Sequence, residues 1–181
     1  SDRIEFDNDV DWYERETMLK VAFPLTTADD SVTYDIGLGT IKRGINTPKK
    51  YEVPGQQWAD MTSPEGDYGV AILNDCKYGI NVLGNSINLT LLKAGLAPDP
   101  MADRGLQTFT YALYPWSGSF ADSNIVREAY ELNVPLLVLP GAGGEGSLFS
   151  LNAPNIVIEA VKPAEDGSGD VIVRLYEAKR M

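Results

Sequence analysis

Short strand-like segments recur along almost the whole chain, and their spacing constrains the fold more than any other feature of the sequence. Most of these segments carry β-branched or aromatic residues and are bounded by Gly, Pro, Asn or Asp, which favour turns. The predicted strands cover residues 3–6, 19–25, 32–38, 57–61, 68–73, 78–83, 86–93, 107–114, 135–139, 155–162 and 170–178. This recurrence predicts an all-β fold.

A single stretch, residues 123–133, breaks the pattern. It offers Ser123 as a helix start, apolar residues near helical spacing, and a stop at Asn133-Val134-Pro135, so we expect one short helix. Strands without regular strand–helix alternation predict an antiparallel β-sandwich rather than a doubly wound sheet. The 181 residues suit one domain, in which residues 141–146 form a loop and residues 165–169 turn a hairpin between the last two strands.

The charge balance narrows the possible partners. Fifteen basic residues against 26 acidic ones give a formal charge of −11, which repels phosphate backbones and argues against a nucleic-acid partner. The longest strongly apolar run, residues 134–140, is too short to cross a bilayer, and no export signal is visible, so no membrane partner is expected. The lone Cys76 cannot form an internal disulfide, which favours a reducing, cytoplasmic location.

Two motifs resemble ligand sites but lack the context that such sites need. Residues 141–146 match a dinucleotide fingerprint, yet no convincing helix follows to hold a pyrophosphate, so a flexible surface loop is expected. Asp7, Asp9 and Asp11 imitate the start of a calcium loop, but the later positions that need Gly and Glu are wrong, which favours a charged strand edge. Histidine is absent, so any chemistry would rest on carboxylates, Lys, Tyr or Cys.

Two polar loops are candidate functional sites. Residues 74–79, with the sequence Asn-Asp-Cys-Lys-Tyr-Gly, carry a density of hydrogen-bonding groups that suits sugar hydroxyls. Turn chemistry explains the same residue types, and from the residues alone a plain hairpin is favoured. In the second loop, Asp99 and Asp103 could bind a cation or act in acid–base chemistry, but an exposed loop with a salt bridge to Arg104 is commoner.

A series of specific motifs runs in order through nearly the whole chain. They are Asp11-Trp12, Leu19-Lys20, Phe23-Pro24-Leu25, Tyr51-Glu52-Val53-Pro54 and Trp58-Ala59-Asp60, followed by residues 68–79, 89–93, 98–100, 102–103, 109–115, 129–136 and 174–178. Together these segments resemble the C-terminal region of family-38 glycoside hydrolases, the α-mannosidases, and especially their cytosolic and bacterial branch.

The resemblance implies that the chemistry of the enzyme lies in another domain. Such enzymes are retaining, exo-acting α-mannosidases, in which an aspartate nucleophile and a zinc ion held by His and Asp sit in a preceding domain. Retention of the anomeric configuration requires two carboxyl groups on opposite sides of the scissile bond, about 5 to 5.5 Å apart. The C-terminal part is a large β-sandwich, similar to the mutarotase-like supersandwich, that packs on the catalytic domain and closes part of the active-site rim. We therefore expect no catalytic residue, metal or cofactor in this chain, with zinc implied for the full-length enzyme.

The same resemblance gives the expected site and partners. Residues 1–181 are expected to be such a region, truncated at both ends and inactive alone. Its expected partners are its own N-terminal catalytic domain and a mannose-containing oligosaccharide, and exposed edges make a homo-oligomer a further possibility. The residues expected to face the substrate rim are Asn74, Asp75, Lys77, Tyr78 and Asp103.

Two other functions stay open from the sequence. One is an independent carbohydrate-binding module that stacks mannose-containing glycans on Trp58 or Trp116, although core packing is the commoner fate of such residues. The other is a purely architectural domain that buries an apolar face of its neighbour. The chain also departs from its relatives, which commonly carry histidine near the positions of Asn46, Gln56 or Gln57, Gln107 and Trp116; a structural role is expected for those histidines.

Overall fold

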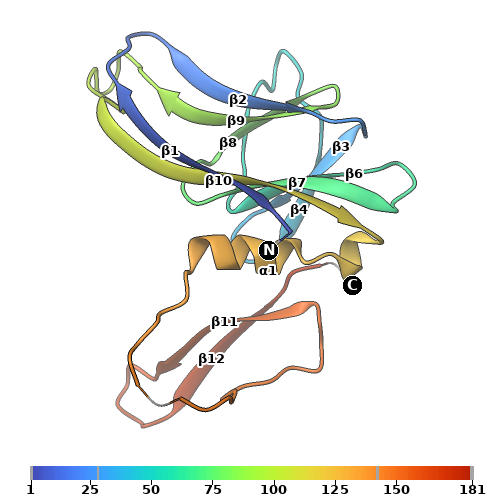
Figure 1. Ribbon diagram of the computed structural model, residues 1–181, viewed down its shortest axis with the longest axis vertical. Coiled ribbons are helices and arrows are strands. Elements are labelled where there is room, and N and C mark those ends of the chain that lie inside the picture. The colour runs from blue at the N-terminus through green and yellow to red at the C-terminus, as the bar shows by residue number, and fades with distance from the viewer. Residues whose placement is uncertain (1, 28, 142, 180–181) are drawn as a thin grey trace.

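Two antiparallel sheets face each other in the computed structural model, which describes residues 2–27, 29–141 and 143–179 (Figure 1). The six-stranded sheet has the order β1-β10-β7-β6-β3-β4, and the four-stranded sheet has the order β2-β9-β8-β5. The first comprises β1 (Ile4–Trp12), β3 (Ser31–Asp35), β4 (Thr40–Gly44), β6 (Trp58–Thr62), β7 (Tyr68–Asn74) and β10 (Gly105–Ser117). The second comprises β2 (Met18–Pro24), β5 (Val53–Pro54), β8 (Gly79–Leu83) and β9 (Ser86–Lys93). The predicted β-sandwich is confirmed.

The main hydrophobic core lies between the two sheets. Along β9, Ile87, Leu89 and Leu91 occupy alternate positions and are buried, because successive residues of a strand point to opposite faces. Tyr34 and Ile72 belong to the same buried cluster and come from the six-stranded sheet. Side chains from the two inner faces therefore form one core, as in other sandwiches.

A second core lies on the outer face of the six-stranded sheet, beneath helix α1 (Ile125–Asn133). Ile125 and Ala129 of the helix pack with Leu73 and Trp58 of the sheet. Because β7 is covered on both faces, it is apolar at consecutive positions rather than alternating. The predicted helix is confirmed, but it begins at Ile125 after a short 3-10 turn, η1 (Phe120–Asp122), and its N-cap residue is Asn124 rather than Ser123.

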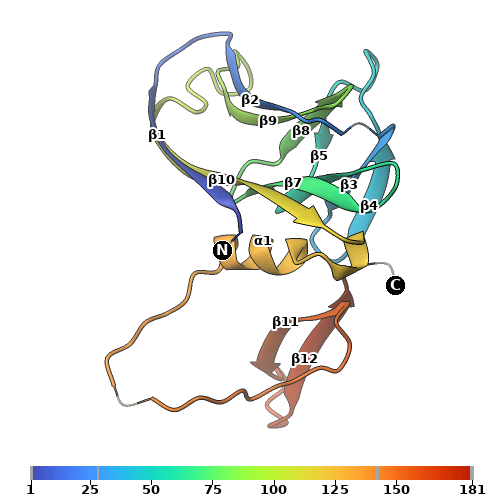
Figure 2. The same cartoon turned by 45° about the vertical axis from the view of Figure 1, so that its right-hand side comes forward.

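Strands β11 (Ile156–Pro163) and β12 (Val171–Glu177) form a separate two-stranded hairpin, as predicted for the last two strands. The hairpin lies on the far side of α1 from the sandwich (Figures 1 and 2). Its open end is held in place, because Ala178 donates a backbone hydrogen bond to the carbonyl of Asn155 (2.8 Å) and Lys179 Nζ donates to the carbonyls of Ala121 (2.6 Å) and Ser123 (3.0 Å).

Some predicted boundaries are corrected by the structure. Strand β1 continues to Trp12, well past residue 6, because Asp7, Asp9 and Asp11 alternate with inward-facing residues and point to solvent along a sheet edge. Strands β4 and β5 are not expected from the sequence: β4 carries two adjacent cations, and β5 has only two residues.

The predicted strand at residues 135–139 is wrong. This segment has no regular structure, and Leu136, Leu137, Val138 and Leu139 are 82–92% exposed. We call residues 134–140 the apolar tether, because they connect α1 to the chain that leads to β11. The loop predicted at residues 141–146 is irregular at 141 and 143–146, while Ala142 lies outside the described residues. No helix in the described part of the chain is long and apolar enough to span a membrane.

Candidate functional site

The polar loop predicted as a sugar-facing site joins β7 of one sheet to β8 of the other. We call residues 74–78 the rim loop. Its first residue, Asn74, is fully buried: the side-chain amide donates to the carbonyl of Gln56 (2.8 Å), and its oxygen accepts from the backbone N–H of Lys77 (2.8 Å). Asn133, the last residue of α1, donates its side-chain amide to the carbonyl of Asn74 (3.0 Å). Asn74 therefore holds the loop rather than presenting polar atoms to solvent.

The middle of the rim loop is fastened to strand β10. Asp75 Oδ2 accepts a hydrogen bond from the backbone N–H of Thr110 (2.8 Å), and the Asp75 N–H donates to the Thr110 carbonyl (3.2 Å). The ammonium of Lys77 lies 4.4 Å from the centre of the Phe109 ring, a cation–π arrangement. Tyr78 follows with 48% of its surface exposed. The loop thus presents the Tyr78 phenol from a fixed backbone.

A shallow groove of about 240 Å³ lies beside the rim loop, where the middle of β1 pairs with β10. It is lined by Asp7, Asn8, Asp9, Asp75, Thr108, Phe109 and Thr110. Thr110 Oγ1 donates to Asp7 Oδ1 (2.9 Å), which ties the groove wall of β1 to that of β10. Ionised carboxylates are acceptors only, so a groove with three aspartates suits ligands that offer hydroxyl donors.

Cys76 does not provide a nucleophile in this loop. Burial, with the neighbouring Asp75 carboxylate as a second cause, raises the pKa of the thiol to about 11. The thiol therefore stays protonated at neutral pH, and the thiolate is the reactive form.

Asp103 is not brought to the rim loop. Its carboxylate accepts the backbone N–H of Lys93 (2.7 Å) at the turn that precedes β10. Gly105, where β10 begins, is five residues from Thr110, a separation of about 17 Å along a strand. Arg104 lies over the Tyr13 ring (5.7 Å) and donates to the Tyr13 carbonyl (3.3 Å), rather than serving as the ion-pair partner expected for the two acids.

The residues of this chain do not fit a zinc site of the kind implied for the full-length enzyme. The sequence has no histidine, and among the described residues no group of three or more His, Cys, Asp or Glu side chains could hold a metal ion. The described residues therefore offer no metal centre of their own.

The tryptophans named for the alternative sugar-stacking platform are core residues, which is the fate expected for their residue type, so they offer no exposed ring for stacking. Trp58 and Trp116 are buried and lie against the ring of Phe120, with ring centres 5.9 and 6.3 Å away. Sequence reasoning also missed Asp60, a fully buried carboxyl that accepts hydrogen bonds from Trp116 Nε1 (2.7 Å) and Thr62 Oγ1 (2.8 Å). Burial raises the pKa of Asp60 to about 7. The sequence offered one signal for this site, because Asp60 stands between two apolar residues, Ala59 and Met61, in a predicted strand.

Comparison with protein-family models identifies the family of this chain. The family model described as "Glycosyl hydrolases family 38 C-terminal domain" matches residues 1–101, more than half of the chain. The chain belongs to this family. The matched part of this family-38 C-terminal domain ends ahead of β10, so the strand that fastens the rim loop lies beyond it.

Relatives extend the match to nearly the whole family-38 C-terminal domain. Alpha-mannosidase 2C1 is 40% identical in Mus musculus and 41% identical in Homo sapiens, in each case over 97% of this chain and 18% of the relative. Alpha-mannosidase G of Dictyostelium discoideum is 35% identical over 98% of this chain and 17% of the relative. The chain therefore spans less than a fifth of the length of these relatives.

Solved structures show the same fold. A crystal structure of an α-mannosidase from Enterococcus faecalis V583 superposes on 98% of this chain with a TM-score of 0.84 and 20% sequence identity, and the match covers 22% of that protein. A second Enterococcus faecalis structure, described as a protein in glycosyl hydrolase family 38, gives a TM-score of 0.78 at 21% identity. The family-38 C-terminal domain, including the hairpin, thus has a counterpart inside a much longer chain.

Proposed function

We propose that this chain is the C-terminal structural and substrate-rim domain of a retaining α-mannosidase that hydrolyses terminal α-mannosyl residues of oligosaccharides. The observation that carries the proposal is its 40% identity, over 97% of its length, to a protein named Alpha-mannosidase 2C1. The lone cysteine supports a cytoplasmic enzyme. On this proposal the chain has two partners: the N-terminal catalytic domain of the same enzyme and a mannose-containing oligosaccharide.

The proposal assigns the bond-breaking chemistry to the rest of the enzyme. An aspartate nucleophile and a zinc ion held by His and Asp belong to the preceding domain, and the chain by itself is inactive. The absence of histidine from the sequence supports this division, because imidazole is the commonest metal ligand and general base.

The proposed contribution of this domain is a wall of hydrogen-bonding groups beside the substrate. The aspartates of the groove beside the rim loop can accept hydrogen bonds from sugar hydroxyls, and the exposed Tyr78 phenol offers both a donor and an aromatic face. A neutral oligosaccharide is not repelled by the formal charge of −11, whereas an anionic ligand would be.

Replacing Tyr78 by Phe in the full-length enzyme tests the rim proposal. We expect kcat/KM for an aryl α-mannoside to fall about fivefold, the usual effect of losing one neutral hydrogen bond, with the melting temperature unchanged. Tyr78 is nearly half exposed, so its hydroxyl can be removed without opening the core. Tyr51→Phe is the matched control, because Tyr51 is 74% exposed and precedes β5 outside the rim loop.

A purely architectural role is the second candidate, and the inward-facing hydrogen bonds of Asn74 favour it. On that alternative Tyr78→Phe leaves both kcat and KM unchanged, while changes at the buried end of the loop alter stability alone. Unchanged kinetics in Tyr78→Phe would therefore refute the rim role and leave the architectural one.

A further inference from the structure

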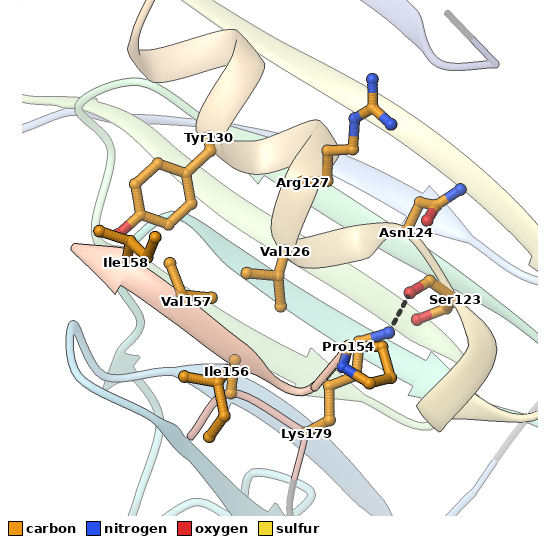
Figure 3. A pocket seen from close by; sticks show the side chains of 11 residues that line it. Ser123, Asn124, Val126, Arg127, Tyr130, Pro154, Ile156, Val157, Ile158 and Lys179 are labelled. Atoms are coloured by element: carbon orange, nitrogen blue, oxygen red, sulfur yellow. Dashed lines mark hydrogen bonds between the residues drawn. The ribbon is translucent and has the colours of Figure 1, made fainter. Parts of the chain in front are cut away.

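The rim loop is held at its two ends by different parts of the domain. At its first end, the Asn74 carbonyl accepts a hydrogen bond from the Asn133 side chain of α1 (3.0 Å). The opposite side of α1 faces β11 across a cavity of about 420 Å³, with Val126 and Tyr130 on the helix side and Ile158 on the strand side (Figure 3). This support therefore has open space behind it, unlike the one at the second end of the loop.

At the second end, a carboxylate lies directly on the backbone that follows Tyr78. Glu52 precedes β5, and its side chain crosses over Gly79, the first residue of β8. Glu52 Oε1 accepts hydrogen bonds from Lys20 Nζ of β2 (2.7 Å) and from Thr90 Oγ1 of β9. Because β2 and β5 are the two edges of the four-stranded sheet, this side chain reaches across the whole sheet. We call Glu52, Lys20 and Thr90 the carboxylate clasp.

The absence of a side chain at Gly79 makes room for the clasp. A Cβ built at Gly79 would meet Glu52 Oε1 at 3.0 Å and the Glu52 Cδ and Thr90 Cβ atoms at 3.2 Å, so the carboxylate would have to move. Gly79 does not have a positive φ, so its backbone conformation does not itself demand glycine. Glycine at this position in a strand is therefore explained by the close approach of the carboxylate.

The carboxylate clasp is charged at neutral pH. Burial opposes ionisation of Glu52, but the hydrogen bonds from Lys20 and Thr90 hold the pKa of its carboxyl below the ordinary value. The Lys20 and Glu52 side chains are only 26 and 25% exposed, so water surrounds neither charge completely. Hydrogen bonds between ionised groups are shorter and stronger than those between neutral groups. The clasp therefore keeps the carboxylate on the backbone of Gly79 instead of releasing it to solvent.

The backbone beneath the clasp is also held from the other side. The Gly55 N–H donates to the Tyr78 carbonyl (3.0 Å), and Gly79 is the register partner of Pro54 in the β5–β8 pair. Ile80, the next residue, is buried in the main core, so its side chain and the clasp lie on opposite faces of β8. The Tyr78 phenol therefore projects from a backbone that is fixed on both faces of the sheet.

We propose that Glu52 is a positioning residue, which acts on the substrate only through Tyr78. Its carboxylate holds the backbone at Gly79 and so sets the place at which the phenol meets a sugar hydroxyl. This inference rests on the proposed rim role of Tyr78, and it adds that the role depends on a charged clasp behind the loop. A clasp that merely stabilised the sheet would not be coupled to the phenol hydroxyl.

A double-mutant cycle in the full-length enzyme tests this coupling. We expect Glu52→Ala to lower kcat/KM for an aryl α-mannoside about fivefold, as Tyr78→Phe does, because both changes lose the same hydrogen bond. For that reason the double variant should also lose about fivefold, rather than about 25-fold. Glu52→Gln should retain about half or more of the parent kcat/KM, since its side-chain oxygen can still accept from Lys20 and Thr90.

Gly79→Ala is a second way to displace the carboxylate, and it removes no polar group. It should lower kcat/KM in the parent enzyme but not in the Tyr78→Phe background. Glu159→Ala is the matched control, because Glu159 is also an ion-paired glutamate, with Arg174 as its partner, and is 27% exposed. Glu159 lies in β11, beyond α1 from the sandwich, so its removal should leave the kinetics unchanged.

Hydrogen exchange measures the hold on the backbone without a sugar. In the full-length enzyme, the Gly55 amide, which donates to the Tyr78 carbonyl, should exchange about tenfold faster in Glu52→Ala than in the parent. Amides of α1 should keep their exchange rates. Unchanged exchange together with unchanged kinetics in Glu52→Ala would overturn the proposal.

The kinetic outcomes separate this proposal from the proposed function. If Tyr78→Phe lowers kcat/KM and Glu52→Ala does not, the rim role stands and the positioning role is refuted. Additive losses in the double variant also refute it, because Glu52 would then act by a route other than Tyr78. If neither single variant changes the kinetics, the rim role itself fails, and faster exchange at Gly55 would leave the clasp as a structural contact only.

Discussion

At pH 7, the Asp60→Asn variant is expected to resist unfolding better than the parent chain by on the order of 4 kcal/mol, and this advantage should vanish near pH 4. Asp60 is fully buried, and burial raises its pKa from 3.8 to about 7 in the folded chain. Between those pH values the unfolded chain loses the proton while the folded chain keeps it, so stability is lost as the pH rises through this window.

Asparagine preserves the local contacts of Asp60 without the titration. Its side-chain oxygen can accept from Trp116 Nε1, and its amide can donate to Thr62 Oγ1, the two groups that Asp60 now contacts. Urea unfolding followed by tryptophan fluorescence at several pH values between 4 and 8 gives the two stability profiles. Asp9→Asn is the control for removing a carboxylate from an exposed position, on the edge of β1. If the Asp60→Asn profile is parallel to the parent, the buried proton plays no part in stability.

Gly69→Ala should destabilise the chain by about 3 kcal/mol, at the upper end of the range for overpacking a core. Gly69 is the register partner of Trp116 in the β7–β10 pair, and the indole lies directly over it. A Cβ at this position would overlap the Trp116 ring, with Cζ2 the nearest atom and Cε2 only 2.6 Å away. The indole would have to move, and its hydrogen bond to Asp60 would be lost with it.

A second substitution separates this clash from a general effect of alanine. Gly69→Ala combined with Trp116→Phe should cost less than the sum of the two single changes, because the smaller ring makes room for the new methyl group. Gly141→Ala is the control, since nothing lies within 4 Å of its added Cβ. Denaturant midpoints measure all four variants. Additive losses in the double variant would contradict the assigned contact.

The fold is largely predictable because its signals are local. Strand β9 has the bounds that its sequence predicts, since an alternating apolar run between turn residues needs no information from elsewhere in the chain. Strand β5 escapes prediction because its two residues take their extended form from pairing with Ile80 and Gly79 of β8. Residues 135–139 have strand composition, but a strand also needs a pairing partner, and composition does not reveal whether one is present.

The site is less predictable because its contacts join residues far apart in the sequence. The loop at residues 74–78 is identifiable from its own polar groups, but the sequence does not show that Asp75 is fastened to Thr110, 35 residues away. For the same reason Asp103, which the sequence groups with the rim loop, proves to lie ahead of the first residue of β10, away from Thr110. The burial of Asp60 depends on Trp116, 56 residues away, so its raised pKa is equally hidden.

The hydrogen bond between the Asn133 side chain and the Asn74 carbonyl joins the last residue of α1 to the first residue of the rim loop. The apolar tether leaves α1 directly after Asn133, so the helix end that contacts the rim loop is also the end from which the tether starts. A change that displaces the end of α1 should therefore also displace the backbone that carries Tyr78.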